Sequence, residues 1–356
     1  MKRSKILALG LALALTAGLL AGCTGGSGSQ SPAPTPSQTV TPALAPSETA
    51  PAEKTAVNLA VLKGPSGVGA AKLLADSDAG ETANDYAYSI LADNTEIVAG
   101  LSSGSLDIAA VASNVAANLY NKTNGGIQIA AVSGLGVLYI LENGDTVHSM
   151  ADLAGRTIYA TGQGANPEYV LNYLLTENGV DPADVDIQWK TGDEITTLMV
   201  SGEADLCMLP VPAATAVQLK NADVREALDL SAEWDNLQNG SHLTMTTIVA
   251  RTDFIEENPQ AVENFLSDYA ASVEFMNDPD NLALSSDENP AQLVASYGIT
   301  ANAQIAEAAI PKCALVCITG ASDMRSAIQG YYEVLYQANP DSIGGGIPDD
   351  AFYYEG

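Results

Sequence analysis

Apolar and polar residues alternate along residues 55–338 in a pattern that predicts strands connected by helices. Short apolar runs bounded by glycine, proline or polar residues indicate buried strands, and apolar residues at helical spacing indicate helices. The predicted strands are residues 57–62, 106–111, 127–132, 137–141, 157–160, 185–189, 204–209 and 245–250. The predicted helices include residues 94–103, 114–120, 194–201, 259–276 and 322–338. This alternation is typical of an α/β fold with parallel strands buried under helices.

Three of the predicted helices begin at clear start signals. Ser113 and Asp193 are polar residues at the N-cap position of a helix. Asn166-Pro167-Glu168 combines a capping asparagine, a proline at the first helical position and an acid in the first turn. We therefore expect the side chains of Ser113, Asn166 and Asp193 to cap their own helices.

The first residues have a different pattern. Lys2, Arg3 and Lys5 precede an apolar run over residues 6–20, which is the order of parts in a secretory signal. A transmembrane helix is the alternative, but the run is shorter than the roughly 20 residues that span a bilayer. We predict that residues 1–22 are a signal peptide and that the rest of the chain is exported.

Residues 23–54 are rich in glycine, serine, threonine, proline and alanine. Such a segment cannot bury enough apolar surface to fold, so we predict a flexible linker. The small residues before Cys23 resemble the bacterial lipobox, in which the cysteine receives a lipid. The resemblance implies that Cys23 is a lipidation site and anchors the protein to the outer face of the cell membrane.

The remaining chain is longer than one hydrophobic core usually serves, which favours two lobes. The strand at residues 245–250 can return to the first lobe. We therefore expect lobe 1 to comprise residues 55–142 and 245–356, and lobe 2 to comprise residues 143–244.

Charge and composition narrow the choice of partners. The chain has 43 acidic and 14 basic residues and a formal net charge of −29. Such a surface repels nucleic acid and anionic lipid headgroups. We expect a monomer that has no nucleic-acid partner and reaches the membrane only through its N-terminal lipid.

Cysteine and histidine positions argue against a disulfide framework and against a metal site. Cys207, Cys313 and Cys317 are an odd number of body cysteines in an exported chain, so we expect free thiols. His148 and His242 have no ligand-like spacing to the cysteines. The sequence predicts no metal and no cofactor.

The loops that follow the strands are the candidate site, because ligands of open α/β sheets lie beyond the carboxyl ends of the strands. These loops share small residues, hydroxyls, amides and the free N–H groups of helix starts, which bind polar or anionic groups. The candidate ligand-binding residues are Lys63, Gly64, Ser66, Gly67, Ser113, Asn114, Ser133, Thr161, Gly162, Gln163, Gly164, Pro212 and Thr215.

No catalytic residue is predicted, because none of these loops contains a nucleophile beside a base. Each loop taken singly is equally well explained as a simple cap or turn, so the prediction depends on the whole set. Lys63 is the one cation among these loops, and it either pairs with an acidic ligand or is merely solvated.

Several stretches resemble a known family. They include VNLAVLKGPSGVGAAKL, SSGSLDIAAVASNVA, SMADLAGRTIYATGQGANPEYVLNYLLTENGVDPADV, EITTLMVSGEADLCMLPVPAAT and ARTDFIEENPQAVENF, which cover most of residues 57–275. They are similar to the substrate-binding proteins of ABC importers in the nitrate/sulfonate/taurine and thiamine-precursor group. One departure is Val211-Pro212, where many relatives have Glu-Pro.

The resemblance implies a two-lobed type II periplasmic-binding-protein fold, in which each lobe is a mostly parallel sheet flanked by helices. Two crossover strands would join the lobes, and the lobes would close around a small organic molecule. The implied partners are an ABC permease and its ATPase, and the implied role is transport without catalysis.

Three alternatives remain open. A dinucleotide enzyme is suggested by Gly64, Gly67 and Gly69 after a strand and by Asp93, but the glycines are not spaced G-x-G-x-x-G from Gly64. A pyrimidine-synthesising enzyme shares the implied fold, but its Cys-rich metal-binding motif is missing from this sequence. A tethered sensor or surface-binding lipoprotein on the same fold is the third.

Overall fold

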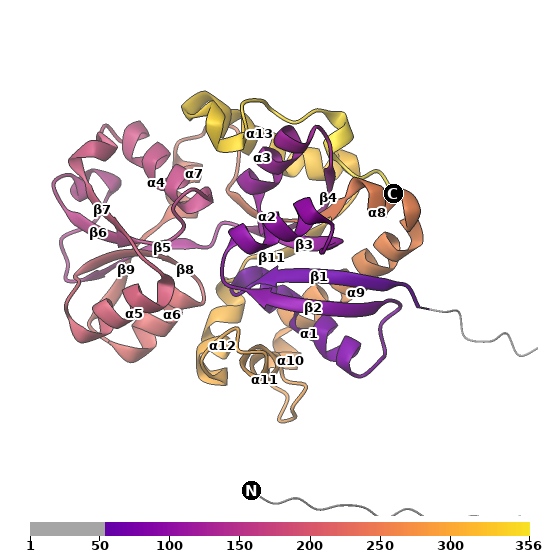
Figure 1. Ribbon diagram of the computed structural model, residues 1–356. Helices are drawn as coiled ribbons and strands as arrows, with labels where there is room; N and C mark the ends of the chain where they lie inside the picture. The colour runs from indigo at the N-terminus through magenta and orange to yellow at the C-terminus, as the bar shows by residue number, and fades with distance from the viewer. Residues whose placement is uncertain (1–53) are drawn as a thin grey trace, which may run out of the picture. The chain divides into compact units, whose positions relative to one another are not determined.

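The computed structural model describes residues 54–356 and arranges their strands in two separate sheets, which Figure 1 shows. The predicted signal peptide, the linker up to residue 53 and the lipidation site Cys23 lie outside the described residues. We call the part of the chain built on the six-stranded sheet lobe 1 and the part built on the five-stranded sheet lobe 2.

The sheet of lobe 1 is mixed, with most of its strands running in one direction. Its spatial order is β11 (Leu315–Ile318), β4 (Ile127–Leu135), β10 (Thr244–Arg251), β3 (Ile108–Ala112), β1 (Ala56–Leu62) and β2 (Asp85–Leu91). The strands β1, β2, β3 and β4 run the same way, and β10 and β11 run against them. Every residue of β3 is buried, which explains its unbroken apolar sequence.

Helices cover this sheet. They are α1 (Pro65–Asp78), α2 (Asn94–Ser103), α3 (Ser113–Thr123), α8 (Thr252–Glu257), α9 (Pro259–Asn277), α10 (Pro279–Leu282), α11 (Pro290–Ser296), α12 (Ala303–Ala309) and α13 (Ala321–Ala338), with 3-10 turns η3 (Ile310–Lys312), η4 (Pro340–Ile343) and η5 (Asp350–Phe352). The small residues of α1 allow close contact with α9: Ser272 Oγ donates to the carbonyl of Gly69 at 2.7 Å, and a Cβ at Gly69 would lie 2.9 Å from the Tyr269 hydroxyl. In the part of the chain that the structure describes, no helix is both long and apolar enough for a membrane span.

Lobe 2 has a smaller sheet with one reversed strand. Its order is β7 (Asp186–Trp189), β6 (Thr157–Ala160), β8 (Leu206–Pro210), β5 (Leu138–Asn143) and β9 (Val224–Asp229), with β5 antiparallel to both of its neighbours. Its helices are α4 (Asn166–Glu177), α5 (Gly192–Ser201), α6 (Ala213–Lys220) and α7 (Leu230–Asn236), with 3-10 turns η1 (Met150–Leu153) and η2 (Pro182–Asp184). Both sheets are flanked by helices, as the sequence predicts.

The chain passes between the sheets twice, at residues 136–137 and 237–243. The strand β10 lies between β3 and β4, so the chain returns to the sheet of lobe 1 after the second crossing. The predicted end of the first segment at residue 142 is too late. Residues 138–143 form β5, whose backbone hydrogen bonds are completed by β8 and β9 of lobe 2.

All three predicted N-cap residues, Ser113, Asn166 and Asp193, are wrong. The N-cap of α3 is Ala112, and Ser113 is already the first helical residue. The N-cap of α5 is Thr191, whose hydroxyl accepts from the amide of Glu194 at 3.3 Å while the Glu194 carboxylate accepts from the Thr191 amide at 2.9 Å. This reciprocal pair satisfies two amides at once, so it takes the place expected for Asp193.

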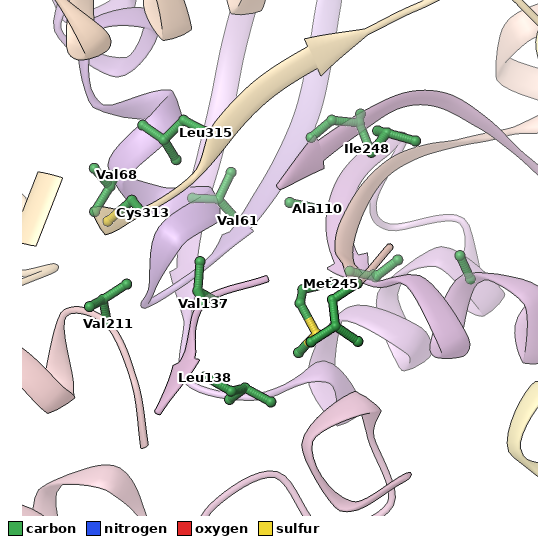
Figure 2. Close-up of a cluster of buried hydrophobic side chains, with 14 of the residues drawn as sticks. Val61, Val68, Ala110, Val137, Leu138, Val211, Met245, Ile248, Cys313 and Leu315 are labelled. Carbon is green, nitrogen blue, oxygen red and sulfur yellow. The ribbon is translucent and has the colours of Figure 1, made fainter. Parts of the chain in front are cut away.

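Apolar side chains fill the junction between the lobes. Figure 2 shows Val61, Val68 and Leu315 of lobe 1 together with Val137 of the first crossing and Val211 of lobe 2. All five are buried and belong to one hydrophobic cluster. The two sheets therefore share a continuous core at the point where the chain crosses between them.

A buried carboxylate organises the loop after β5. Glu142 is 1% exposed and accepts from the amides of Thr146 and Val147 and, at 2.6 Å, from the Arg225 guanidinium. Burial alone would raise the pKa of Glu142, but these hydrogen bonds outweigh it and hold the pKa below its usual value. The carboxylate thus stays ionised and fixes residues 143–147 against β9.

We predict that Glu142→Gln lowers the free energy of unfolding at neutral pH by about 2 kcal/mol, because a buried charged acceptor and its guanidinium partner are lost. Since the pKa is lower in the folded protein, this contribution is complete above the unfolded-state pKa of about 4.3 and is lost as the pH falls through the folded-state value. Denaturant unfolding at neutral pH and at a pH below the folded-state pKa of Glu142 measures this contribution. Glu177→Gln at the exposed end of α4 is the control. Equal losses in both variants would contradict the assigned role.

Candidate ligand-binding site

The structure places the candidate residues in two groups, one at the carboxyl edge of each sheet. Lobe 1 contributes the turn between β1 and α1 and the first turn of α3. Lobe 2 contributes the loop between β6 and α4 and the start of α6. Parallel strands end at the same edge of a sheet, so the loops of each lobe are neighbours.

The turn after β1 is tightly packed. Ser66 is buried, and its hydroxyl accepts from the amide of Leu62 at 3.2 Å. A Cβ at Gly67 would lie 2.6 Å from the carbonyl oxygen of Leu62, so only glycine fits there. The Gly64 backbone is extended, and the side chain of Lys63 is exposed. The turn therefore offers backbone amides next to one solvated cation.

The start of α3 lies deeper than its sequence suggests. Ser113 is fully buried, and its hydroxyl donates to the carbonyl of Thr244 in β10. Asn114 is 2% exposed, and its Nδ2 donates to the carbonyl of Ser342 at 3.3 Å. Among the described residues, Oδ1 of Asn114 has no hydrogen-bond partner. An unpaired buried acceptor is costly and leaves a position for a donor.

Ser133 does not belong to a loop, contrary to the sequence-based expectation. It lies inside β4, is fully buried, and donates to the Thr246 hydroxyl of β10 at 3.2 Å. The strand continues to Leu135 because β10 and β11 both pair with this stretch. Ser133 is thus a sheet residue, and its hydroxyl bridges two strands.

The loop of lobe 2 that precedes α4 depends on its glycines. Gly162 and Gly164 have φ values of 88° and 75°, and a Cβ at Gly162 would lie 2.5 Å from Cγ of Pro167. Gln163 and Gly164 are exposed, and Thr161 is half-buried. The amide of Gly164 donates to the Glu168 carboxylate, so an acid of the protein already occupies this position.

The start of α6 is the other part of the candidate site in lobe 2, and it is buried. Pro212 follows a cis peptide bond, and Thr215 is 4% exposed. The Thr215 hydroxyl has no hydrogen-bond partner among the described residues. Val211 is 1% exposed and packs in the apolar junction of Figure 2. An ionised carboxylate in place of Val211 would be buried, and it would be costly there without a partner.

Four helices that begin at these edges lack a side-chain cap from their own segment. They are α1, α3, α4 and α6, whose N-cap residues are Gly64, Ala112, Ala165 and Pro212. The feature is not confined to them, since α8, α9 and α13 also lack one. Uncapped helix starts present amide N–H groups and a partial positive charge. Of the four, only α4 has an acid in its first turn, Glu168.

The role that the sequence predicts for Asn166 is wrong. Asn166 does not cap α4, whose N-cap is Ala165. Its Nδ2 instead donates to the Ser113 hydroxyl at 2.9 Å and the Met245 carbonyl at 2.6 Å, and its Oδ1 accepts from the Tyr331 hydroxyl at 2.9 Å. The Asn166-Pro167 signal correctly marks the helix start, but nothing local reveals that the side chain points into lobe 1.

Burial keeps the three cysteine thiols of the described residues in their neutral form. Burial raises the pKa of the Cys313 thiol to about 12 and that of Cys317 to about 11, and it also raises that of Cys207. The three thiols are free, with Cys317 only partly buried. Across residues 54–356 no group of three or more acidic, histidine or cysteine side chains could hold a metal ion. Both histidines are exposed.

Two surface cavities lie elsewhere. One, of about 530 Å³, is next to β7 in lobe 2 and is lined by residues that include Pro182, Asp184 and Trp189. The other, of about 550 Å³, lies beside Arg251 and Asp253 in lobe 1. No candidate ligand-binding residue lines either of them.

Solved structures with the same arrangement define the class. An ABC transporter structure from Parabacteroides distasonis is similar with a TM-score of 0.67 and 22% identity, over 85% of this chain and 99% of that one. The periplasmic aliphatic sulphonate binding protein of Escherichia coli gives 0.66 and 15%, over 85% and 93%. The alkanesulfonate-binding protein of Xanthomonas axonopodis pv. citri, bound to MOPS, gives 0.62 and 13%, over 84% and 96%. The fold is thus that of the two-lobed periplasmic binding proteins.

The sequence itself identifies the family. The family described as NMT1/THI5 like matches residues 92–282, more than half of the chain. The chain therefore belongs to the NMT1/THI5-like family. No curated protein sequence gives a significant match.

The turn after β1 gives a test of packing. We predict that Gly67→Ala destabilises the protein by about 1–3 kcal/mol, because its new methyl group overlaps the Leu62 carbonyl. Gly64→Ala is the matched control, since nothing lies within 4 Å of its Cβ position and its backbone is extended. Thermal unfolding of both variants measures the difference. A Gly67→Ala protein as stable as Gly64→Ala would contradict this packing.

Proposed function

We propose that the protein is an extracytoplasmic solute-binding lipoprotein that captures a small organic molecule between its lobes and delivers it to an ABC importer. The observation that carries the proposal is that α3 and α4, which face each other across the two lobes, both begin without a side-chain cap from their own segment. The family and fold are those of transport binding proteins. An ABC permease and its ATPase are the proposed partners, and the protein acts as a monomer without a catalytic step.

The helix ends support a polar or anionic ligand group held toward lobe 1. Neither α1 nor α3 has an acid in its first turn, whereas Glu168 already occupies the amide of Gly164 at the start of α4. The amide end of α1, and the amides of α3 other than that of Asn114, which Asn166 accepts from, are therefore the positions where a negative group gains most. Structures of relatives named for sulfonate binding are consistent with this polarity.

The dinucleotide alternative is disfavoured by the role of its proposed acid. Asp93 caps α2 by accepting from the amide of Thr95 at 2.7 Å, and Gly67 and Gly69 lie inside α1 rather than in a loop before it. A tethered sensor remains the second candidate function, because it would use the same site. Gene neighbours that encode a permease and an ATPase favour the importer role over the sensor.

A thermal-shift screen tests ligand capture. We expect one class among sulfonates, carboxylates, pyrimidines, thiamine-related compounds and flavins to stabilise the protein by about 2.7 kcal/mol at ~100 times its dissociation constant. For a chain of this size the melting temperature should rise by about 5 °C. Absence of stabilisation by every class would count against solute capture.

The substitution Gly164→Asp tests whether the ligand binds beside the loop before α4. We expect it to weaken binding of the best hit at least about tenfold, because it adds a carboxylate at the loop before α4. Gly179→Asp is the matched control, since Gly164 and Gly179 share a φ near +75° (75° and 77°) and open space around the Cβ position. Unchanged affinity in Gly164→Asp would move the site elsewhere.

Lipid anchoring depends on Cys23, and we predict that Cys23→Ala releases the exported protein from the membrane. Fractionation of a bacterial host that expresses the full chain measures this, with mass spectrometry of the N-terminal peptide to detect the lipid. Cys317→Ala serves as the control for loss of a thiol. A Cys23→Ala protein that stays in the membrane fraction would contradict anchoring through this residue.

A further inference from the structure

Asn166 joins the two lobes through hydrogen bonds that use its whole side chain. Its Nδ2 donates to Ser113 Oγ and to the Met245 carbonyl, and its Oδ1 accepts from the Asn114 amide at 3.2 Å and from the Tyr331 hydroxyl. A carboxamide has two N–H donors and two acceptor positions, so none is left over. Asn166 belongs to α4 of lobe 2, and all four partners belong to lobe 1.

The bond to the Asn114 amide completes a helix start across the lobe boundary. No side chain of its own segment caps α3, and the Oδ1 of Asn166 occupies the position of a cap acceptor. Asn166 is fully buried. When the lobes separate, the α3 amide and the Asn166 carboxamide must both leave these partners for water.

We propose that Asn166 is the positioning residue that holds the two lobes closed, by acting as an N-cap for α3 from the opposite lobe. The closed arrangement is then stabilised by contacts of the protein itself, and a ligand adds its own contacts to them. A larger closed population raises the apparent affinity of any ligand that needs closure. This consequence rests on the proposed solute-binding function, whereas the closing role itself does not.

The interlobe distance tests the proposal without any ligand. Spin labels on keto-bearing amino acids at Glu96 of α2 and Glu177 of α4, both exposed, report the distance between the lobes in the full chain by double electron–electron resonance. For Asn166→Ala we expect the ratio of long-distance to short-distance populations to rise at least about fivefold, on the order of one net hydrogen bond. Tyr331→Phe removes one partner and should shift the ratio the same way by less.

Two further variants make the result decisive. Asn172→Ala is the same substitution on the same helix, where the side chain makes none of these bonds, and its distances should match those of the unmodified sequence. Asn166→Asp keeps the shape and both acceptor positions but cannot donate to Ser113 and Met245, so it should also favour the long distance. If Asn166→Ala does not fold, the distances in Asn166→Asp test the proposal alone.

Unchanged distances in folded Asn166→Ala or in Asn166→Asp would overturn the proposal. That failure is distinct from a failure of the solute-binding function, which the thermal-shift screen tests separately. If the variants change the interlobe distances but the screen finds no ligand, the closing role of Asn166 is supported and the proposed solute-binding function is contradicted.

Discussion

A buried amide group must find its partners inside the protein, and this constraint sets how the two lobes meet. The Asn166 carboxamide is fully buried, and each of its hydrogen-bonding positions is used by lobe 1. Leaving even one such position unpaired costs about 1–3 kcal/mol. In this arrangement of the lobes, the starts of α3 and α4, the strand β10 and the helix α13 are therefore held in one relative placement. The apolar junction beneath them, which includes Val137 and Val211, adds non-directional stabilisation but little orientation.

The same helix starts also set the chemistry of the candidate site. The ends of α1 and α3, which have no cap from their own segment, supply fixed dipoles. Burial raises the pKa values of the thiols, so they stay protonated at neutral pH. The buried carboxylate of Glu142 accepts a hydrogen bond from Arg225 and fixes its own loop. The chemistry at the candidate site is thus one of amides and hydroxyls.

Local sequence was sufficient for most of the elements. The strand β6 and the helix α2 lie at the residues that the pattern predicts, because a buried strand and an amphipathic helix each leave a short-range signature. The strand β9 was missed, since its sequence VREALD mixes charged and apolar residues on a half-exposed strand. The first crossing was placed too late for a related reason: the glycines near residue 136 mark a break but do not say which sheet the next strand joins.

The sequence by itself determined the α/β class, the family and the positions of the loops, because periodicity, glycine placement and helix-start signals are properties of neighbouring residues. Only the tertiary structure decided the use of individual polar side chains. The sequence predicts that Ser113 and Asn166 cap their own helices, yet each side chain bonds to another element. Ser133 lies within a strand instead of a loop. A polar group bonds to whichever partner the packed chain brings within reach, and residues far apart in sequence supply those partners.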